Sequence, residues 1–362
     1  MAQTDDEFAP YRITPNTARR PPGGFEPRFR QSRELEERLR RIERLDQQLT
    51  VYEDALTTSH LRLRQALAIN SHGTASIEGN PLSLAAVESL LERAPSMVDV
   101  QADEREILNW VAFMRNLDEH AFPTDLSGVR ALHAILMAGV LPDAGAFKEG
   151  QNFIAARSGE VVFVPSPAAA VQSELTAALN WLHTAPLHPI LRASLFFIEY
   201  QGIHPFRDGN GRTGRALFTW YLHEAGYRGI RYALVDAAFN NDRQPYYATL
   251  HEVETNGYDY TPWIDYLVEV SEAAYRDAVA AMELDRDHPS LNERQRDLVA
   301  WFLRITTANK RRRVKFADVH AAFPHFAPRS LQRDLARLVD ARVIRREGDR
   351  RGAVYWIRPP SG

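Results

Sequence analysis

Apolar residues recur at helical spacing along most of the chain. Leucines and one isoleucine, three or four positions apart among charged residues, predict an amphipathic helix from Arg33 to about Leu56. The same spacing predicts further helices at about 61–70, 84–94, 107–117, 127–140, 170–184, 190–203 and 216–226. Runs rich in β-branched residues are short and few. We therefore expect a mainly α fold, a helical bundle with a small β-hairpin.

The N-terminal end departs from this pattern. Residues 1–30 are rich in proline, glycine and arginine, which predicts an extended arm rather than a packed element. The start of the chain has neither a basic segment nor an apolar stretch of signal-peptide length, and no later run approaches the length of a membrane span. These observations favour a cytoplasmic protein.

The C-terminal end differs in charge. Near Asp287 the segment DHPSLN interrupts the helical pattern, and from Asn292 onward basic residues outnumber acidic ones by more than two to one. The pattern there predicts a helix at 293–303, a basic turn at 310–315, helices at 316–323 and 328–341, and strands at 343–348 and 353–358. This order is typical of a winged helix-turn-helix domain. We expect domains at 1–30, 31–286 and 287–362.

The helix at 328–341 would be the recognition helix of this predicted domain. Its exposed face would present Arg329, Ser330, Gln332 and Arg333, with Arg350 and Arg351 at the tip of the wing. Such a surface suits DNA. A winged helix also serves to dimerise or to dock a protein, so the sequence leaves DNA, a protein partner and a homodimer as alternatives.

Composition adds two limits. The chain has 362 residues, a net charge of −3 and no cysteine, which excludes disulfides and thiolate metal sites. No histidine spacing is typical of zinc, and His133 and His188 stand in apolar or proline-rich contexts. We expect both histidines to be structural.

The chemistry of the chain concentrates in the twelve residues from His204 to Arg215, HPFRDGNGRTGR. They lie between the apolar run at 190–203 and the helical pattern at 216–226, so they predict a glycine loop that opens a helix. Such a loop points free N–H groups and the positive end of the helix dipole at its guest, which favours an anion. Phosphate is the expected ligand.

Each polar residue of the loop has an expected role. An unshifted histidine titrates near neutral pH, so His204 is the candidate general base. Phe206 offers only apolar surface and is expected to anchor the loop. Asp208 would repel a polyphosphate unless a hard cation lay between them, and magnesium binds few carboxylates together with substrate phosphates. Asp208 is therefore the candidate Mg²⁺ ligand, with Mn²⁺ as an alternative ion.

The remaining residues are expected to bind the phosphates. Gly209, Gly211 and Gly214 let the backbone approach closely, and the Asn210 amide can donate a hydrogen bond to the anion. Two arginines three positions apart share a face of the first helical turn, where each can fork onto phosphate oxygens. These are Arg212 and Arg215.

A dinucleotide site is the main alternative for this stretch. GNGRTG, at 209–214, matches GxGxxG, and the strand-like RYALVD ends at Asp236, at about the distance of a ribose-binding carboxylate. That fingerprint requires its first glycine directly after a buried strand, whereas the polar HPFRD intervenes here. The context therefore disfavours a dinucleotide.

The stretch resembles the signature of the Fic family, HxFx(D/E)GNGRxxR, at every specified position. The resemblance implies a mostly helical fold and the transfer of AMP from ATP to a hydroxyl group of a target protein. It implies His204 as base, Asp208 as metal ligand, Asn210 and the glycines as cradle, and the two arginines as clamp on the outer phosphates. Relatives that transfer phosphate alone depart from the GNGR portion, and this chain does not.

A second segment extends the resemblance. TASIEGN, at 74–80 within a helical region of about 60–80, is similar to the inhibitory motif (S/T)xxxE(G/N), which implies a class II member. A guanidinium cannot bind a carboxylate and a γ-phosphate bidentately at once. Glu78 would thus compete for Arg215, with Thr74 as a supporting contact. The simpler alternative is a surface glutamate at a helix end capped by Gly79.

Two further segments carry weaker expectations. EVVFVPSP, at 160–167, predicts a hairpin, and the resemblance implies a flap at about 157–167 that docks the target through Val162, Phe163 and Val164. The alternative is a merely packed hairpin. The preceding FKEGQNFI, at 147–154, resembles the approach to that flap. The aromatic segment 240–267 supplies nucleobase candidates, although its rings can equally be core packing. They are Asn240, Tyr246, Tyr247 and Asn256.

Three functions remain open on the sequence. The first is an adenylyltransferase that modifies Tyr, Thr or Ser of a target protein and of itself. The second is a DNA-binding regulator whose Fic-like domain senses a nucleotide. The third is removal of AMP by the same residues, with Glu78 positioning water.

Overall fold

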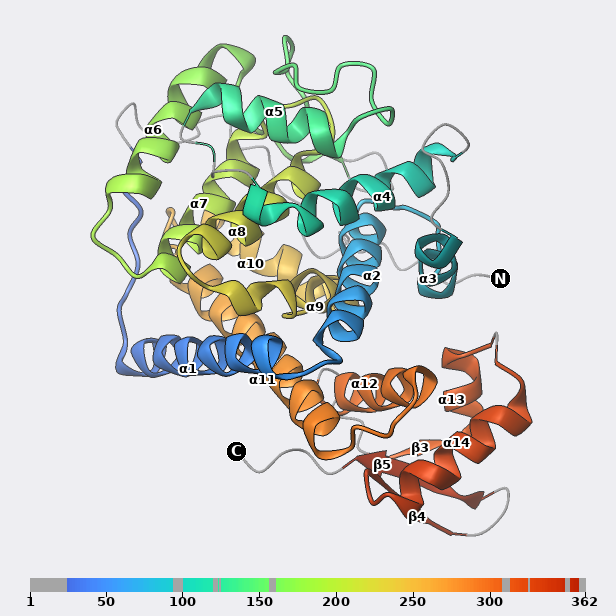
Figure 1. Cartoon of the computed structure of the whole chain (residues 1–362). Helices are drawn as coiled ribbons and strands as arrows, with labels where there is room; N and C mark the ends of the chain where they lie inside the picture. Colours follow the sequence, from blue (N-terminus) through green and yellow to red (C-terminus); the bar gives the residue numbers. More distant parts are fainter. Residues whose placement is uncertain are drawn as a thin grey trace.

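Helices dominate the computed structural model of this chain, which describes residues 25–357 except 94–99, 120–122, 124, 156–160, 308–312, 325 and 349–351 (Figure 1). The helices of the larger, N-terminal part are α1 (Arg33–Ala55), α2 (Ser59–Ile77), α3 (Leu84–Arg93), α4 (Ala102–Arg115), α5 (Leu126–Leu136), α6 (Val171–Thr184), α7 (Pro189–Ile203), α8 (Asn210–Glu224), α9 (Val235–Asn241), α10 (Arg243–Thr255) and α11 (Thr261–Asp287). Short 3₁₀ helices lie at Leu117–Glu119, Ala168–Ala170 and Arg228–Arg231. The expected mainly α fold is confirmed.

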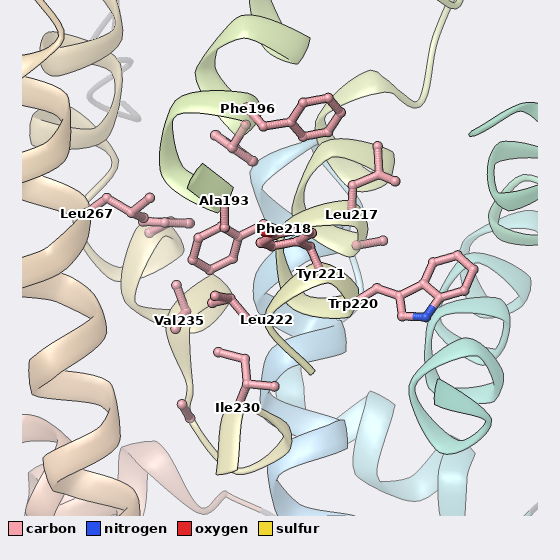
Figure 2. Close-up of a cluster of buried hydrophobic side chains, with 14 of the residues drawn as sticks. Ala193, Phe196, Leu217, Phe218, Trp220, Tyr221, Leu222, Ile230, Val235 and Leu267 are labelled. Atoms are coloured by element: carbon pink, nitrogen blue, oxygen red, sulfur yellow. The ribbon is translucent and has the colours of Figure 1, made fainter. Parts of the chain in front are cut away.

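The centre of this part is formed by α7 and α8, which are joined by the loop at 204–209. Their facing sides are almost wholly apolar, and Figure 2 shows Ala193 and Phe196 of α7 beside Leu217, Phe218 and Leu222 of α8. Every one of these side chains is at most 3% exposed. Interior packing of this density fixes the two helix axes and therefore the ends of the loop between them.

The helices α1 and α11 pack along each other through an ionic cluster. Glu272 on α11 is 3% exposed and binds Arg38 and Arg41 of α1 at 3.1 and 2.9 Å, and Arg276 of its own helix at 2.5 Å. The pKa of Glu272 is lowered, because these guanidinium groups outweigh the effect of burial, which by itself raises it. The carboxylate therefore stays charged and holds the two helices together.

The C-terminal part has its own apolar core. It consists of α12 (Glu293–Thr307), β3 (Val314–Lys315), α13 (Phe316–Ala322), α14 (Pro328–Asp340), β4 (Ile344–Glu347) and β5 (Val354–Ile357). The strands form an antiparallel sheet in the order β3-β5-β4. In Figure 1, α11 extends from the larger part to this one, and Ala280 near its end belongs to the second core.

A buried ion-pair network joins the two parts. Asp285 on α11 binds Arg62 of α2 at 2.7 Å and Arg296 of α12 at 2.9 Å, and all three side chains are at most 7% exposed. Removing one partner from such a network leaves a buried charge without compensation. The C-terminal part is thereby attached to α2, the helix whose other end carries Thr74.

Several expectations need correction. Residues 25–30 are not a free arm, because Phe25 is 4% exposed and packs edge-on against Trp181 and Tyr260. Residues 314–315 of the expected basic turn form strand β3, since they pair with β5. The strand expected at 231–236 is absent. Its residues lie in a 3₁₀ helix and the start of α9, which removes the strand that a dinucleotide fold requires.

The hairpin expected near 160–167 is present in a shifted form. Its strands are β1 (Ile154–Ala155) and β2 (Val161–Phe163), which pair antiparallel. The residues between these strands, and those of the expected wing tip, Arg350 and Arg351, lie outside the described residues. No helix in the described segments is long and apolar enough to cross a membrane.

Candidate active site

The loop from His204 to Gly209 begins and ends with a residue in the left-handed backbone conformation. His204 ends α7 with a φ of 51°, and Gly209 begins α8 with a φ of 77°. A Cβ on Gly209 would come within 2.7 Å of Met137 Sδ and 3.0 Å of His133 Nε2. Only glycine meets both the backbone angle and the close approach of α5.

Asn210 shapes this loop through its side-chain amide. Its Nδ2 donates to the carbonyl of Phe206 at 2.9 Å, and its Oδ1 accepts from the N–H of the same residue at 2.9 Å. The side chain is 1% exposed. Both amide atoms have partners in the turn, and the expected hydrogen bond from Asn210 to phosphate stays a prediction.

Phe206 anchors the loop as expected. Its ring is fully buried and stacks on His133 with centroids 3.7 Å apart. The Nδ1 atom of His133 accepts from the N–H of Gly145 at 2.8 Å, so its Nε2 carries the proton and donates to the Asp208 carbonyl at 3.0 Å. Burial lowers the pKa of His133, which keeps it neutral. His133 is therefore structural, as expected, and it holds the loop at 204–209 in place.

The FKEGQNFI segment also holds the loop. Lys148 Nζ donates to the carbonyl of Ile203 at 3.2 Å, and its N–H donates to the carbonyl of Pro205 at 2.9 Å. Asn152 Nδ2 donates to the carbonyl of Phe206 at 3.0 Å. The backbone of the loop is thus bound from two sides before any ligand arrives.

The imidazole of His204 is set up as a base. Its Nδ1 donates to the carbonyl of Gln201 at 3.0 Å, which leaves Nε2 with a lone pair in the neutral ring. The side chain is partly exposed, and burial of the remainder lowers its pKa to about 4. At neutral pH the ring is uncharged and Nε2 can accept a proton.

Asp208 fits a cation that is bound mainly by phosphates. Its side chain is 59% exposed, and its Oδ1 accepts from the Gly209 N–H at 2.5 Å and pairs with Arg212 at 3.2 Å. The described residues contain no group of three or more metal-ligating side chains. One exposed carboxylate is what a magnesium ion that keeps water and phosphate ligands requires.

Arg215 lies at the centre of the site with 1% exposure. Its Nε donates to Thr74 Oγ1 at 2.7 Å, and its Nη2 donates to the Thr74 carbonyl at 3.0 Å and to Glu78 Oε1 at 2.7 Å. The expected pair between Glu78 and Arg215, and the expected contact with Thr74, are both present. Burial by itself lowers the pKa of Arg215, but the charge of Glu78 outweighs this effect. The net pKa is raised, so the guanidinium remains charged.

The Glu78 carboxylate occupies the mouth of the glycine turn. A Cβ built on Gly211 would collide with Glu78 Oε1 and Cδ. The carboxylate therefore lies directly over the first turn of α8, where the helix dipole favours an anion. Gly214 has another role than expected, because a Cβ there would meet Gln201 and the Tyr200 ring of α7. It permits helix packing and does not face the anion.

Arg212 also holds carboxylates. Its Nη1 lies 2.9 Å from Glu106 Oε1 on α4, and its Nη2 lies 3.2 Å from Asp208 Oδ1. Burial raises the pKa of Glu106, although Arg212 and Asn80 oppose the rise. Both arginines of the signature are thus paired with acids in this state of the molecule.

Asp236 supports Arg215 from behind. It is 4% exposed and accepts a hydrogen bond from the Thr74 side chain, which in turn accepts from Arg215. Burial raises the pKa of Asp236 to about 6, an effect that the charge of Arg215 opposes. The residue considered for a ribose is therefore part of the arginine site.

The nucleobase candidates are spread over different environments. Tyr246 is 3% exposed and lies among Phe239, Trp263 and Tyr247, with ring centroids 4.9 to 6.0 Å away. Asn240 accepts from Arg243 at 2.7 Å. Asn256 is exposed and bonds the backbone of Asp259 in its own turn. Tyr246 and Asn256 are therefore engaged in structure, while the role of all four as base contacts stays a prediction.

The flap candidates lie in and after β2. Phe163 and Val164 are half-buried, and the side chain of Val162 is outside the described residues. Phe153, just before β1, is 56% exposed. Four residues that the structure brings to the site were not among the candidates chosen from the sequence, namely Asn80, Glu106, Lys148 and Asn152. Glu106 had a signal, because it stands three and four positions before Asn109 and Trp110 on the buried face of α4.

Comparison with known proteins agrees with this geometry. Residues 123–222 match the model of the Fic/DOC family. Protein adenylyltransferase Fic of Drosophila ananassae is 32% identical over 200 residues, which are 52% of this chain and 39% of that protein. Protein adenylyltransferase fic-1 of Caenorhabditis elegans is 26% identical over 237 residues, or 62% and 44%. The chain thus spans about two fifths of the length of these relatives.

Solved structures give the same fold. A Fic family protein from Desulfovibrio desulfuricans superposes with a TM-score of 0.62 at 21% identity, over 93% of this chain and 100% of that one. Fic-1 from C. elegans superposes with a TM-score of 0.54 at 22% identity, over 70% and 74%. With the signature complete and its loop built as described, residues 123–222 form a domain of the Fic/DOC family.

Proposed function

We propose that this protein is an adenylyltransferase that moves AMP from ATP to a hydroxyl side chain of a target protein. The observation that carries the proposal is the Glu78 carboxylate over Gly211, held by Arg215. It marks an anion position at the start of α8, beside a neutral histidine with a free lone pair. Relatives named protein adenylyltransferases match 52% and 62% of the chain, and the Fic/DOC family model matches residues 123–222, which contain this loop.

The chemistry follows from the positions of these groups. Nε2 of His204 takes the proton of a Tyr, Thr or Ser hydroxyl as its oxygen attacks the α-phosphorus of ATP. The bond between that phosphorus and the bridging oxygen breaks, and diphosphate leaves. Arg212 and Arg215 bind the departing phosphates, and Asp208 would hold a magnesium ion that would supply charge neutralisation there. The product is an AMP ester of the target hydroxyl.

Glu78 keeps the resting enzyme inactive in this proposal. Its carboxylate and a γ-phosphate compete for the same guanidinium edge of Arg215, because that edge accepts one bidentate anion. Glu78 is 27% exposed and follows the last turn of α2, so it can turn outward without disturbing the core. Thr74 and Asp236 remain in place and keep Arg215 oriented for the incoming nucleotide.

The decisive experiment uses ATP labelled at the α-phosphate. With Mg²⁺, the Glu78→Gly variant should label itself much more strongly than the wild-type protein, and Glu78→Gly combined with His204→Ala should remain unlabelled. ATP labelled at the γ-phosphate should transfer nothing. A Glu78→Gly protein that binds ATP but acquires no α-label would overturn the proposal, and acquisition of γ-label would indicate phosphoryl transfer instead.

A specific observation supports DNA binding by the C-terminal part as a second function. The elements α12, β3, α13, α14, β4 and β5 follow the order of a winged helix. On α14, Arg329, Arg333 and Arg337 are exposed at spacings of four, so they form one basic stripe. None of the ion pairs found in the described segments involves these three residues. Retardation of a random-sequence duplex in a gel, lost at high salt, would support this function, and no retardation at low salt would exclude it.

A further inference from the structure

Glu106 is a buried carboxylate that binds two parts of the site at once. It lies on α4, 8% exposed, outside the sequence signature. One oxygen lies 2.9 Å from Arg212 Nη1. The other accepts a hydrogen bond from Asn80 Nδ2, also at 2.9 Å. The buried carboxylate thus forms an ion pair through one oxygen and a hydrogen bond through the other, and both contacts restrain the partner side chains.

Asn80 belongs to the turn that carries Glu78. The N–H of Gly79 donates to Ser76 and that of Asn80 donates to Ala75, so the turn closes directly on the end of α2. The Asn80 amide then reaches across to α4, where it binds Glu106 and the carbonyl of Asp103 at 3.0 Å. The position of Glu78 is thereby set from the side of α4 as well as from α2.

These contacts close a circuit around the anion position. It runs from Arg215 to Glu78, along the turn to Asn80, then to Glu106 and Arg212. The Nε atom of Arg212 is buried and makes no hydrogen bond to any described residue. The guanidinium therefore keeps donor capacity on the edge away from Glu106, while Glu106 holds its other end.

We propose that Glu106 and Asn80 form a tether that positions Arg212 and holds the Glu78 turn closed against Arg215. The inference rests on the proposed function and adds a regulatory element to the same site. Neither residue contacts Arg215, and neither lies in the glycine turn. The tether explains how the turn keeps Glu78 in place although Glu78 itself is partly exposed. Any partner that draws α4 away from the turn would release the inhibitory carboxylate.

The tether can be broken without touching the catalytic loop. Asn80→Ala should raise the self-labelling rate about threefold to tenfold, because the hydrogen bonds from Asn80 to Glu106 and to the Asp103 carbonyl, and the one that it accepts from the Leu82 N–H, are lost. Ser83→Ala is the matched control, since Ser83 accepts a local bond from Ala86 in the same connection but does not contact Glu106. In the Glu78→Gly background Asn80→Ala should have no further effect. An equal rise in both backgrounds, or none in the wild-type background, would contradict the tether.

A charge swap tests the hydrogen bond itself. Asn80→Asp alone places two carboxylates together and should release the turn, so labelling rises. Asn80→Asp combined with Glu106→Gln exchanges donor and acceptor, and should return labelling toward the wild-type rate. Absence of this rescue with a normal melting temperature would count against the proposed bond. Glu106→Gln in the Glu78→Gly background should raise KM for ATP severalfold while kcat changes little, since Arg212 loses its ion pair. A loss of kcat without a change in KM would show that Glu106 does not position Arg212.

Two readouts separate this inference from the proposed function. Hydrogen–deuterium exchange of residues 75–82 should quicken in Asn80→Ala and not in Ser83→Ala, whatever reaction the enzyme performs. Binding of a non-hydrolysable ATP analogue, measured by calorimetry, should tighten in Asn80→Ala. If Glu78→Gly transfers no label while these two changes occur, the tether stands and the transferase proposal fails. If Glu78→Gly is active while Asn80→Ala equals Ser83→Ala in both readouts, the tether fails alone.

Discussion

The glycine loop and the face of α14 are both rich in arginine, but they use it in opposite ways. In the loop, Arg212 and Arg215 are at most 7% exposed and each is paired with specified acids. On α14, Arg329, Arg333 and Arg337 are exposed. A buried, paired guanidinium exchanges one anion for another at a fixed place, whereas an exposed stripe attracts any polyanion by charge. We propose that the first arrangement provides a switch and the second a docking surface.

The largest difference between the two regions should appear in stability. Arg215→Ala leaves Thr74 and Asp236 buried without their guanidinium partner, and should lower the free energy of unfolding by about 3 kcal/mol. Arg333→Ala, the matched exposed variant, should change it by less than about 0.5 kcal/mol. Urea denaturation of both variants measures the contrast. Equal losses would show that the burial of Arg215 contributes no specific stabilisation.

The loss for Arg215→Ala should also depend on pH. The pKa of Asp236 is already raised to about 6 by burial, and removal of the neighbouring charge raises it further. A carboxyl group with a raised native pKa binds more protons folded than unfolded, so stability falls as pH rises. The variant should therefore lose more stability at pH 8 than at pH 5. An equal loss of stability at pH 5 and pH 8 would show that protonation of Asp236 does not contribute to the loss.

Asp208 provides the next contrast, because its carboxylate is exposed although it belongs to the loop. Asp208→Asn keeps the shape of the side chain and removes the charge that binds a cation. In the Glu78→Gly background this variant should lower the labelling rate by about 10- to 100-fold, with partial recovery at high Mg²⁺. A titration with Mg²⁺ measures the shift, and an unchanged Mg²⁺ requirement would mean that the cation binds elsewhere.

The pH profile of labelling tests whether burial in the loop lowers the pKa of His204. With a pKa lowered to about 4, the ring is the neutral, active form at every pH above about 5. The Glu78→Gly variant should thus keep nearly the same rate from pH 7.5 down to 5.5. A histidine with an unshifted pKa of about 6.5 would lose about tenfold over that interval. Such a loss would show that the loop opens His204 to solvent.

Much of the fold can be predicted from local sequence patterns, but the side-chain contacts within the loop at 204–209 cannot. Helical periodicity correctly placed α1 and α6, and the glycines and flanking patterns of 204–215 correctly predicted a loop that opens a helix. The contacts of Asn210 with the backbone of Phe206 were not predicted, because the sequence shows an amide but not the backbone groups that it meets. The helices α9 and α10 were not predicted, since their aromatic and polar residues lack a clear apolar period.

Long-range pairs were the hardest to predict. Glu106 and Arg212 are far apart in sequence, and neither carries a local signal of the other. Glu78 and Arg215 were joined only because the resemblance to a family connected the two segments. By contrast, the character of α14 could be read from its charges alone, because an exposed stripe needs no partner within the chain. Predicting a buried pair requires knowledge of the whole fold, whereas predicting an exposed stripe requires only the helical spacing of its residues.

The smallest effect concerns that stripe. If α14 binds DNA through its arginines, each contact to a phosphate releases about one counterion. Arg333→Ala should weaken binding to a random duplex by a few fold and reduce the slope of log K against log salt by about 1. Arg40→Ala, an exposed arginine paired with Glu36 on α1, is the control and should leave both quantities unchanged. Fluorescence anisotropy at several salt concentrations gives both values. An equal change in the two variants would mean that the overall charge of the protein, and not the face of α14, attracts the duplex.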